Sequence, residues 1–183
     1  MSFVMGVGGV GANAVQGARI AGAARIIAID PAPFNREMAG KFGATHMYAS
    51  AEEALEPIKD MTRGEMANAA LVTVDLTTGK VIGDAVSLVG KGGKVALTAL
   101  AAVTDNQVEF PIFELIAYEK QIIGCLFGHS NPRSDIPKML SLYRDGKLML
   151  DELVTRTYTL DQINEGYEAM RTHQNIRGLV VYD

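Results

Sequence analysis

A glycine-rich run near the amino terminus has the spacing of a phosphate-binding loop. It follows an apolar stretch, precedes a stretch rich in small residues, and reads Gly6-Val7-Gly8-Gly9-Val10-Gly11. In such a loop Gly6 permits a tight turn, Gly8 lets the backbone approach a pyrophosphate, and Gly11 lets the next helix lie close to the strand. The helix N-terminus then presents free N–H groups to negative charge. The run therefore predicts a dinucleotide-binding loop.

An acidic residue follows this loop at the matching distance. Asp30 ends the apolar run RIIAID, and 30 − 11 = 19 residues separate it from the last glycine, close to the spacing of about 20 in dinucleotide-binding folds. A carboxylate there accepts hydrogen bonds from the adenosine ribose and repels a 2′-phosphate, which favours NAD over NADP. Arg36 keeps NADP as a less favoured alternative. A glycine turn followed by an ordinary helix-capping aspartate is the alternative without a ligand.

The elements that must position these residues alternate between short apolar runs and longer amphipathic stretches. This alternation is typical of parallel strands joined by crossover helices. We expect an α/β Rossmann fold with a doubly wound, parallel, six-stranded sheet, whose strands cover residues 3–7, 25–30, 46–48, 70–76, 94–99 and 121–126. Helices are predicted over residues 10–21 and from Ser50, with Glu53 three positions later, through Lys59. Pro111 indicates an edge segment or the end of a strand.

The remaining residues have no place in a finished sheet. They predict a loop over 129–135, a helix over 136–144, a strand near 154–160, a helix over 161–170 and a last strand over 177–182. We therefore divide the chain into a dinucleotide-binding domain, residues 1–129, and a C-terminal segment, residues 130–183, that belongs to a second structural unit.

Composition narrows the classes of partner. The net charge of −4 provides no basic field for nucleic acid or an anionic membrane. The single cysteine, Cys125, cannot form an internal disulfide, and no apolar run approaches the roughly 18 residues of a membrane span. The amino terminus lacks the basic region and cleavage site of a signal peptide. A cytoplasmic protein that binds small molecules is expected.

Four stretches of the sequence resemble one known family. They are MGVGGVGANAVQGARIAGAARIIAID, KFGATH, IIGCLFGHSNPRSDIPKML and LDQINEGYEAMRTHQNIRGLVVY. They are similar to the C-terminal, NAD-binding portion of the zinc-containing medium-chain alcohol dehydrogenases, including class III and actinobacterial-like enzymes. The resemblance implies an NAD-dependent oxidoreductase that transfers hydride between a primary alcohol, an aldehyde or a thiol–aldehyde adduct and the cofactor.

The resemblance also implies residue roles. Gly8, Gly9 and Val10 would line the pyrophosphate and nicotinamide, and Asp30 the ribose. The carboxamide would be held by Thr98, Ala99 and the backbone of Cys125 and Phe127. Arg177 would provide a further contact with the pyrophosphate. Two positions depart from the family: Asn35 stands where many relatives have a basic side chain near the ribose, and Thr98 replaces a small residue. Asp75, in the apolar run ALVTVDLTTG, would need hydrogen-bond partners if buried.

In this family, cysteine and histidine side chains of a separate domain hold a catalytic zinc. This sequence contains no such set of ligands. Cys125 lies in a predicted buried strand, where a thiol is inert, and His46, His129 and His173 are scattered. No catalytic or metal-binding residue is predicted, so this chain should bind cofactor without turnover. Expected partners are the missing catalytic domain and a second copy, through residues 108–118. A free-standing NAD(H)-sensing module and a zinc-free, quinone-reductase-like enzyme using NADPH remain alternatives.

Overall fold

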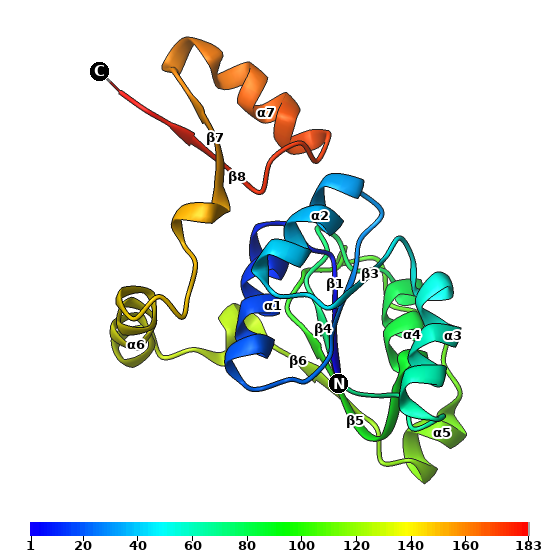
Figure 1. Ribbon diagram of the computed structural model, residues 1–183. Coiled ribbons are helices and arrows are strands. Elements are labelled where there is room, and N and C mark those ends of the chain that lie inside the picture. Colours follow the sequence, from blue (N-terminus) through cyan, green and yellow to red (C-terminus); the bar gives the residue numbers. More distant parts are fainter. Residues whose placement is uncertain (183) are drawn as a thin grey trace.

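A parallel six-stranded sheet forms the centre of the computed structural model, which describes residues 1–182 (Figure 1). The spatial order is β3-β2-β1-β4-β5-β6, the order of a doubly wound Rossmann sheet, which confirms the predicted fold. The strands are β1 (Ser2–Met5), β2 (Ile26–Ile29), β3 (His46–Tyr48), β4 (Ala67–Val72), β5 (Val89–Leu97) and β6 (Gln121–Gly124). Because all six are parallel, their carboxyl ends share one edge of the sheet.

Helices cover both faces of this sheet (Figure 1). Phe3 on β1 packs in a cluster with α3 (Ala51–Thr62) and α4 (Gly79–Leu88), whereas its neighbour Val4 packs in a second cluster with α1 (Gly9–Ile20) and α2 (Pro33–Phe42). Successive strand residues point to opposite faces, and both faces are buried, so β1 is apolar at every position after Ser2. The fifth helix of this part of the chain is α5 (Ile112–Ala117).

The predicted start of α3 is confirmed. Ser50 Oγ accepts a hydrogen bond from the Glu53 N–H at 3.2 Å, and the Glu53 carboxylate accepts one from the Ala49 N–H at 3.0 Å. These bonds satisfy two N–H groups at the helix entrance, which is how a capping residue stabilises a helix. The helix continues past Lys59 to Thr62 and ends where Arg63 adopts a left-handed φ of 54°.

Five of the six strands of the large sheet end before the predicted residue, and the difference matters most for β4 and β6. β4 ends at Val72, so Asp75 lies beyond the sheet and is exposed rather than buried. β6 ends at Gly124, and Cys125 follows it half-buried instead of lying within a buried strand. In both places the apolar sequence continues after the last strand pairing, where the chain turns away from the sheet edge.

The stretch around Pro111 forms no strand and instead packs on α4. Pro111 is the N-cap of α5, so of the two predicted alternatives, an edge segment or the end of a strand, the strand is wrong. A Cβ on Gly79 would lie 1.9 Å from the carbonyl oxygen of Gln107, and one on Gly83 would lie 2.5 Å from that of Glu109. Any side chain at these two positions would collide with the segment, so the two glycines allow its backbone to lie directly against α4.

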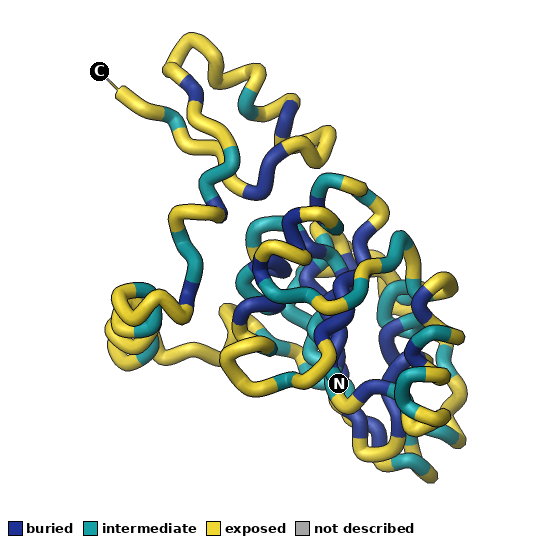
Figure 2. The backbone as a smooth tube through the Cα atoms, viewed as in Figure 1, coloured by how far each residue is buried: buried dark blue, intermediate teal, exposed yellow. Residues whose placement is uncertain are grey.

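The C-terminal residues build a second, smaller sheet. Strands β7 (Val154–Tyr158) and β8 (Arg177–Val180) pair in parallel and flank α7 (Ile163–Arg171), apart from the six-stranded sheet (Figure 1). The preceding helix α6 (Pro132–Arg144) begins inside the predicted loop. Figure 2 shows the buried backbone concentrated in the large sheet, whereas the C-terminal unit is largely exposed. None of the helices within residues 1–182 is long and apolar enough to cross a membrane.

Candidate functional site

The glycine-rich loop occupies the carboxyl end of β1. Gly6 has a φ of 85°, and a Cβ there would lie 2.7 Å from the Val74 backbone. A Cβ on Gly11 would lie 1.9 Å from the Gly6 carbonyl oxygen, whereas one on Gly8 would meet nothing within 4 Å in the described chain. Packing therefore requires glycine at the first and last positions. The space in front of Gly8 is open to a ligand, as pyrophosphate binding requires.

Thr73, directly after β4, holds the glycine-rich loop through its side chain. Its hydroxyl donates to the Gly6 carbonyl at 2.5 Å and lies 3.2 Å from the Met5 carbonyl. These contacts join the end of β4 to the turn after β1, so the loop is held by a neighbouring strand as well as by its own glycines. Nothing in the run ALVTVD distinguishes Thr73 from an ordinary strand threonine, so its role could not be predicted from the sequence.

Asp30 lies directly after β2 and connects the glycine loop to α2. Its side chain is buried, with 5% of the residue exposed. Oδ2 accepts hydrogen bonds from the Val7 N–H at 2.7 Å and from Asn35 Nδ2 at 3.1 Å, and Oδ1 accepts one from the Ala32 N–H at 2.8 Å. Three donors thus fix the carboxylate beside the loop, at the edge where ligands bind in open α/β sheets.

Arg36 lies next to this carboxylate without pairing with it. Its Nη1 donates to the carbonyl oxygens of Asp30 at 2.7 Å and Pro31 at 2.8 Å. The guanidinium is therefore held against the backbone at the end of β2. Asn35, where a basic side chain near the ribose is common in the resembling family, is buried with 3% exposed.

Arg177 approaches the same loop from the C-terminal unit. It begins β8 and is exposed, and its Nη2 lies 4.0 Å from the position of a Cβ on Gly9. The Ile176 carbonyl oxygen lies 3.4 Å from that position. Val10, in the first turn of α1, is exposed beside them. The structure thus brings the guanidinium to the uncapped N-terminus of α1, where a phosphate would gain charge-assisted hydrogen bonds.

The remaining predicted residues lie at the carboxyl ends of β5 and β6. Thr98 turns its hydroxyl back to the Val72 carbonyl at 3.0 Å, and Ala99 next to it is half-buried. The Cys125 N–H donates to the Leu97 carbonyl at 2.8 Å. Phe127 is 86% exposed with a left-handed φ of 48°. These residues share the sheet edge with the glycine loop, on the far side of β4 from Asp30.

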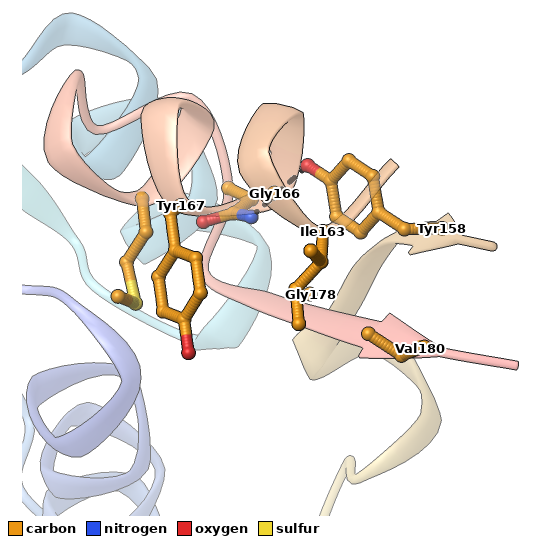
Figure 3. A pocket seen from close by; sticks show the side chains of 8 residues that line it. Tyr158, Ile163, Gly166, Tyr167, Gly178 and Val180 are labelled. Carbon is orange, nitrogen blue, oxygen red and sulfur yellow. Dashed lines mark hydrogen bonds between the residues drawn. The ribbon is translucent and has the colours of Figure 1, made fainter. Parts of the chain in front are cut away.

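Two hollows border helix α7 of the C-terminal unit. The one in Figure 3, of about 200 Å³, lies between α7 and β8, and Asn175 Nδ2 donates to the Tyr158 hydroxyl there at 3.3 Å. The other lies between α7 and the loop after β4, and Asp75, Tyr167 and Arg171 are among its lining residues. Asp75, unexplained by the sequence, thus faces α7 across this hollow.

Metal-ligating side chains are scattered over the part of the chain that the structure describes. Among residues 1–182 no three histidine, cysteine, aspartate or glutamate side chains lie close enough together to hold a metal ion. The residues described therefore do not fit a catalytic zinc, which needs three protein ligands.

Two side chains of α6, Asp135 and Tyr143, have pKa values that local hydrogen bonds shift. Hydrogen bonds from the Asn131 N–H and then from Lys138 lower the pKa of Asp135. The Asp151 carboxylate raises the pKa of Tyr143 by accepting a hydrogen bond from its hydroxyl. Because the pKa of Asp135 is lowered in the folded chain, ionised Asp135 adds to the free energy of unfolding near neutral pH. This contribution is lost as the pH falls through that lowered pKa. These groups fix the ends of α6 and lie outside the glycine-loop site.

Comparison with known proteins places this fold and site in one family. A model of the zinc-binding dehydrogenase family matches residues 9–145. The chain is 46% identical over 179 residues to the NDMA-dependent alcohol dehydrogenase of Amycolatopsis methanolica, covering 98% of this chain and 48% of that protein. It is 32% identical to S-(hydroxymethyl)glutathione dehydrogenase of Paracoccus denitrificans, covering 99% of this chain and 49% of that protein.

The fold agrees with a solved structure as well. Benzyl alcohol dehydrogenase from Acinetobacter calcoaceticus superposes with a TM-score of 0.88 at 28% identity, covering 98% of this chain and 48% of that one. The chain belongs to the zinc-binding dehydrogenase family, as the resemblance predicted, and corresponds to its C-terminal, nucleotide-binding portion. It spans about half the length of the curated relatives it matches.

Proposed function

We propose that this chain is the NAD-binding part of a zinc-dependent alcohol dehydrogenase. The observation that carries the proposal is the hydrogen bond from the Val7 N–H to Asp30 Oδ2, which joins the glycine loop to the acidic residue after β2. This bond supports the proposal because dinucleotide recognition requires a phosphate-binding loop and a ribose-binding carboxylate side by side.

Each part of the site then has a task. Bound NAD supplies a nicotinamide ring that accepts hydride. The N-terminus of α1 and Arg177 neutralise the pyrophosphate, and the open face of Gly8 lets it approach the backbone. Asp30 accepts a ribose hydroxyl. The backbone after β5 and β6, from Thr98 to Ala99 and from Cys125 to Phe127, holds the carboxamide and so orients the ring.

The whole protein is proposed to exchange hydride between a primary alcohol, an aldehyde or a thiol–aldehyde adduct and NAD. The names of the relatives from Amycolatopsis and Paracoccus support this substrate range. Because residues 1–182 offer no zinc ligand set, we propose that this chain binds cofactor and that turnover needs a catalytic domain as partner. We place the protein in the cytoplasm.

Nucleotide titration tests the proposed cofactor. NADH should bind with micromolar to submillimolar affinity by calorimetry, and NADPH more weakly, because the Asp30 carboxylate repels a 2′-phosphate. Asp30→Ala should weaken NADH binding by about tenfold or more, since a hydrogen bond to a charged group contributes roughly 1.5–3 kcal/mol.

Because Asp30 also holds the loop, Asp30→Asn serves as the shape-preserving variant, with thermal unfolding followed in parallel. Asp60→Ala, which removes an exposed charge near the end of α3, should leave NADH affinity unchanged. Tighter binding of NADPH than NADH would favour the quinone-reductase-like alternative. Absence of binding by either nucleotide would reject the site.

We further propose a homodimer through the β6 edge of the sheet. Near this edge strand, α5 exposes Ile112, Phe113 and Ile116 to 68%, 73% and 72%. An unpaired strand edge beside exposed apolar side chains is typical of an association surface.

Phe113→Glu should shift the chain from dimer to monomer in sedimentation equilibrium, because a charge would be buried at the contact. Met47→Glu, on β3 at the opposite edge and 42% exposed, is the matched control and should leave the dimer intact. A monomeric unaltered chain, or a Phe113→Glu variant that remains a dimer, would contradict this surface.

A further inference from the structure

Asp75 is an exposed carboxylate at the carboxyl edge of the six-stranded sheet. It lies three residues after the end of β4, beyond the last strand pairing. None of the ion pairs within residues 1–182 includes it. Because ligands bind at the carboxyl edge of an open α/β sheet, a charge at this position lies where it can act on a ligand.

The segment after β4 crosses the space between the glycine loop and the end of β5. On one side, a Cβ on Gly6 would lie 2.7 Å from the Val74 backbone. On the other side, the Thr77 N–H donates to the Leu100 carbonyl oxygen at 2.9 Å. Asp75 lies between these two contacts, and therefore between the turn after β1 and the residues that follow β5.

The hollow beside Asp75 has the size of a small-molecule site. Its volume is about 500 Å³, and Tyr167, Met170 and Arg171 of α7 are among its lining residues. Arg171 donates to the Glu168 carboxylate through Nε at 3.2 Å and through Nη2 at 2.5 Å, so its charge is paired within α7. Asp75 therefore contributes a negative charge to this hollow that no ion pair among residues 1–182 offsets.

A dinucleotide bound as proposed would pass this carboxylate. Its pyrophosphate would lie at Gly8 and its carboxamide beside Thr98 and Cys125, which are on opposite sides of the segment after β4. The nicotinamide ring carries a positive charge in NAD⁺ and none in NADH, whereas the pyrophosphate is the same in both. A carboxylate near the ring therefore attracts the oxidised form alone, and its repulsion of the pyrophosphate acts equally on both forms.

We infer that Asp75 selects the oxidation state of the bound cofactor, favouring NAD⁺ over NADH through its charge. This inference rests on the proposed NAD-binding function and adds to it a residue that distinguishes the two forms of the cofactor. By linkage, the factor by which Asp75 changes the ratio of the two affinities also shifts the equilibrium between the two bound forms toward NAD⁺.

Asp75→Asn tests the inference, because it removes the charge and keeps the shape of the side chain. The measured quantity is the dissociation constant of NAD⁺ divided by that of NADH, each from calorimetry at low ionic strength. This ratio should rise about twofold to fivefold in the variant, the range of an exposed ion pair. In salt of about 1 M the difference between the two chains should shrink, because the Debye length falls to roughly 3 Å.

Asp75→Lys extends the test to the opposite charge. The ratio should rise in the order unaltered chain, Asp75→Asn, Asp75→Lys, because each step adds one unit of positive charge. The thermal midpoint of Asp75→Asn should stay unchanged, since the side chain is exposed and forms no ion pair among residues 1–182. A purely structural aspartate would change the midpoint, or the affinity for both nucleotides alike, without this order.

Asp60→Asn is the matched control, because Asp60 is an exposed carboxylate near the end of α3, away from the glycine loop. It should leave the ratio unchanged. If Asp75→Asn binds both nucleotides with the ratio of the unaltered chain, the inference fails and the proposed function stands. Equal strengthening of both nucleotides would mean that Asp75 acts on the pyrophosphate alone, and the inference again fails. If the unaltered chain binds neither nucleotide, both fail together.

Discussion

Gly11→Ala is expected to lower the free energy of unfolding by about 3 kcal/mol and to abolish NADH binding. The added Cβ would lie 1.9 Å from the Gly6 carbonyl oxygen and 2.9 Å from Thr73 Oγ1. Overpacking costs typically 1–3 kcal/mol, and here the obstruction is backbone, which cannot rotate away. Helix propensity acts in the opposite direction, because alanine is favoured over glycine within a helix by about 1 kcal/mol. The clash should dominate, and urea denaturation measures the balance.

Gly8→Ala separates ligand binding from folding. A Cβ there meets no described atom within 4 Å, so urea denaturation should show a change of no more than about 0.5 kcal/mol. NADH affinity should nevertheless fall about tenfold or more, because the methyl group would stand where the pyrophosphate approaches the backbone.

Gly17→Ala is the matched control in the same helix, since its added Cβ also meets no described atom within 4 Å. It should stabilise the chain by about 0.5–1 kcal/mol and leave NADH affinity unchanged. Full stability of Gly11→Ala would contradict the close packing of α1 on the loop, and unchanged affinity of Gly8→Ala would place the pyrophosphate elsewhere.

The order of strands and helices could be predicted because both faces of the sheet are covered. Under two helical layers every residue of β1 and β2 is buried, so these central strands appear in the sequence as short, mainly apolar runs. Strand ends were less predictable. Val74 and Leu76 extend the apolar run past Val72, although the chain has already left the sheet there. Leu76 is 56% exposed, so the apolar run continues after both strand pairing and burial have ended.

The site was predictable where recognition is local in sequence. The glycine spacing and the distance to Asp30 follow from one strand–helix–strand unit, so the loop and its acid could be named without the structure. Contacts between distant segments left no such pattern. Thr73 meets Gly6 across 67 residues, and a threonine in a strand is unremarkable on its own. Asn35 was interpreted by analogy with basic residues in relatives, whereas its burial and its bond to Asp30 required coordinates.

Gln16→Leu is expected to destabilise the chain by about 3 kcal/mol and to loosen the C-terminal unit. Gln16 is fully buried in α1, where Nε2 donates to the Met149 carbonyl at 2.9 Å and Oε1 accepts from the Met149 N–H at 2.7 Å. Leucine fills a similar volume but leaves both backbone groups unpaired, and each such group costs roughly 1–3 kcal/mol. Urea denaturation and hydrogen exchange at the Met149 amide measure the two effects.

The consequence for the nucleotide site follows from the route of the chain. Met149 precedes β7, and β7 pairs with β8, where Arg177 faces Gly9. Loosening at Met149 should therefore weaken NADH binding although Gln16 itself makes no ligand contact. Gln174→Leu, an exposed glutamine in the same unit, should change neither Met149 protection nor affinity. Unaltered protection in Gln16→Leu would mean that Leu153 and Ile176, buried against α1 and α2, hold the C-terminal unit without the paired amide.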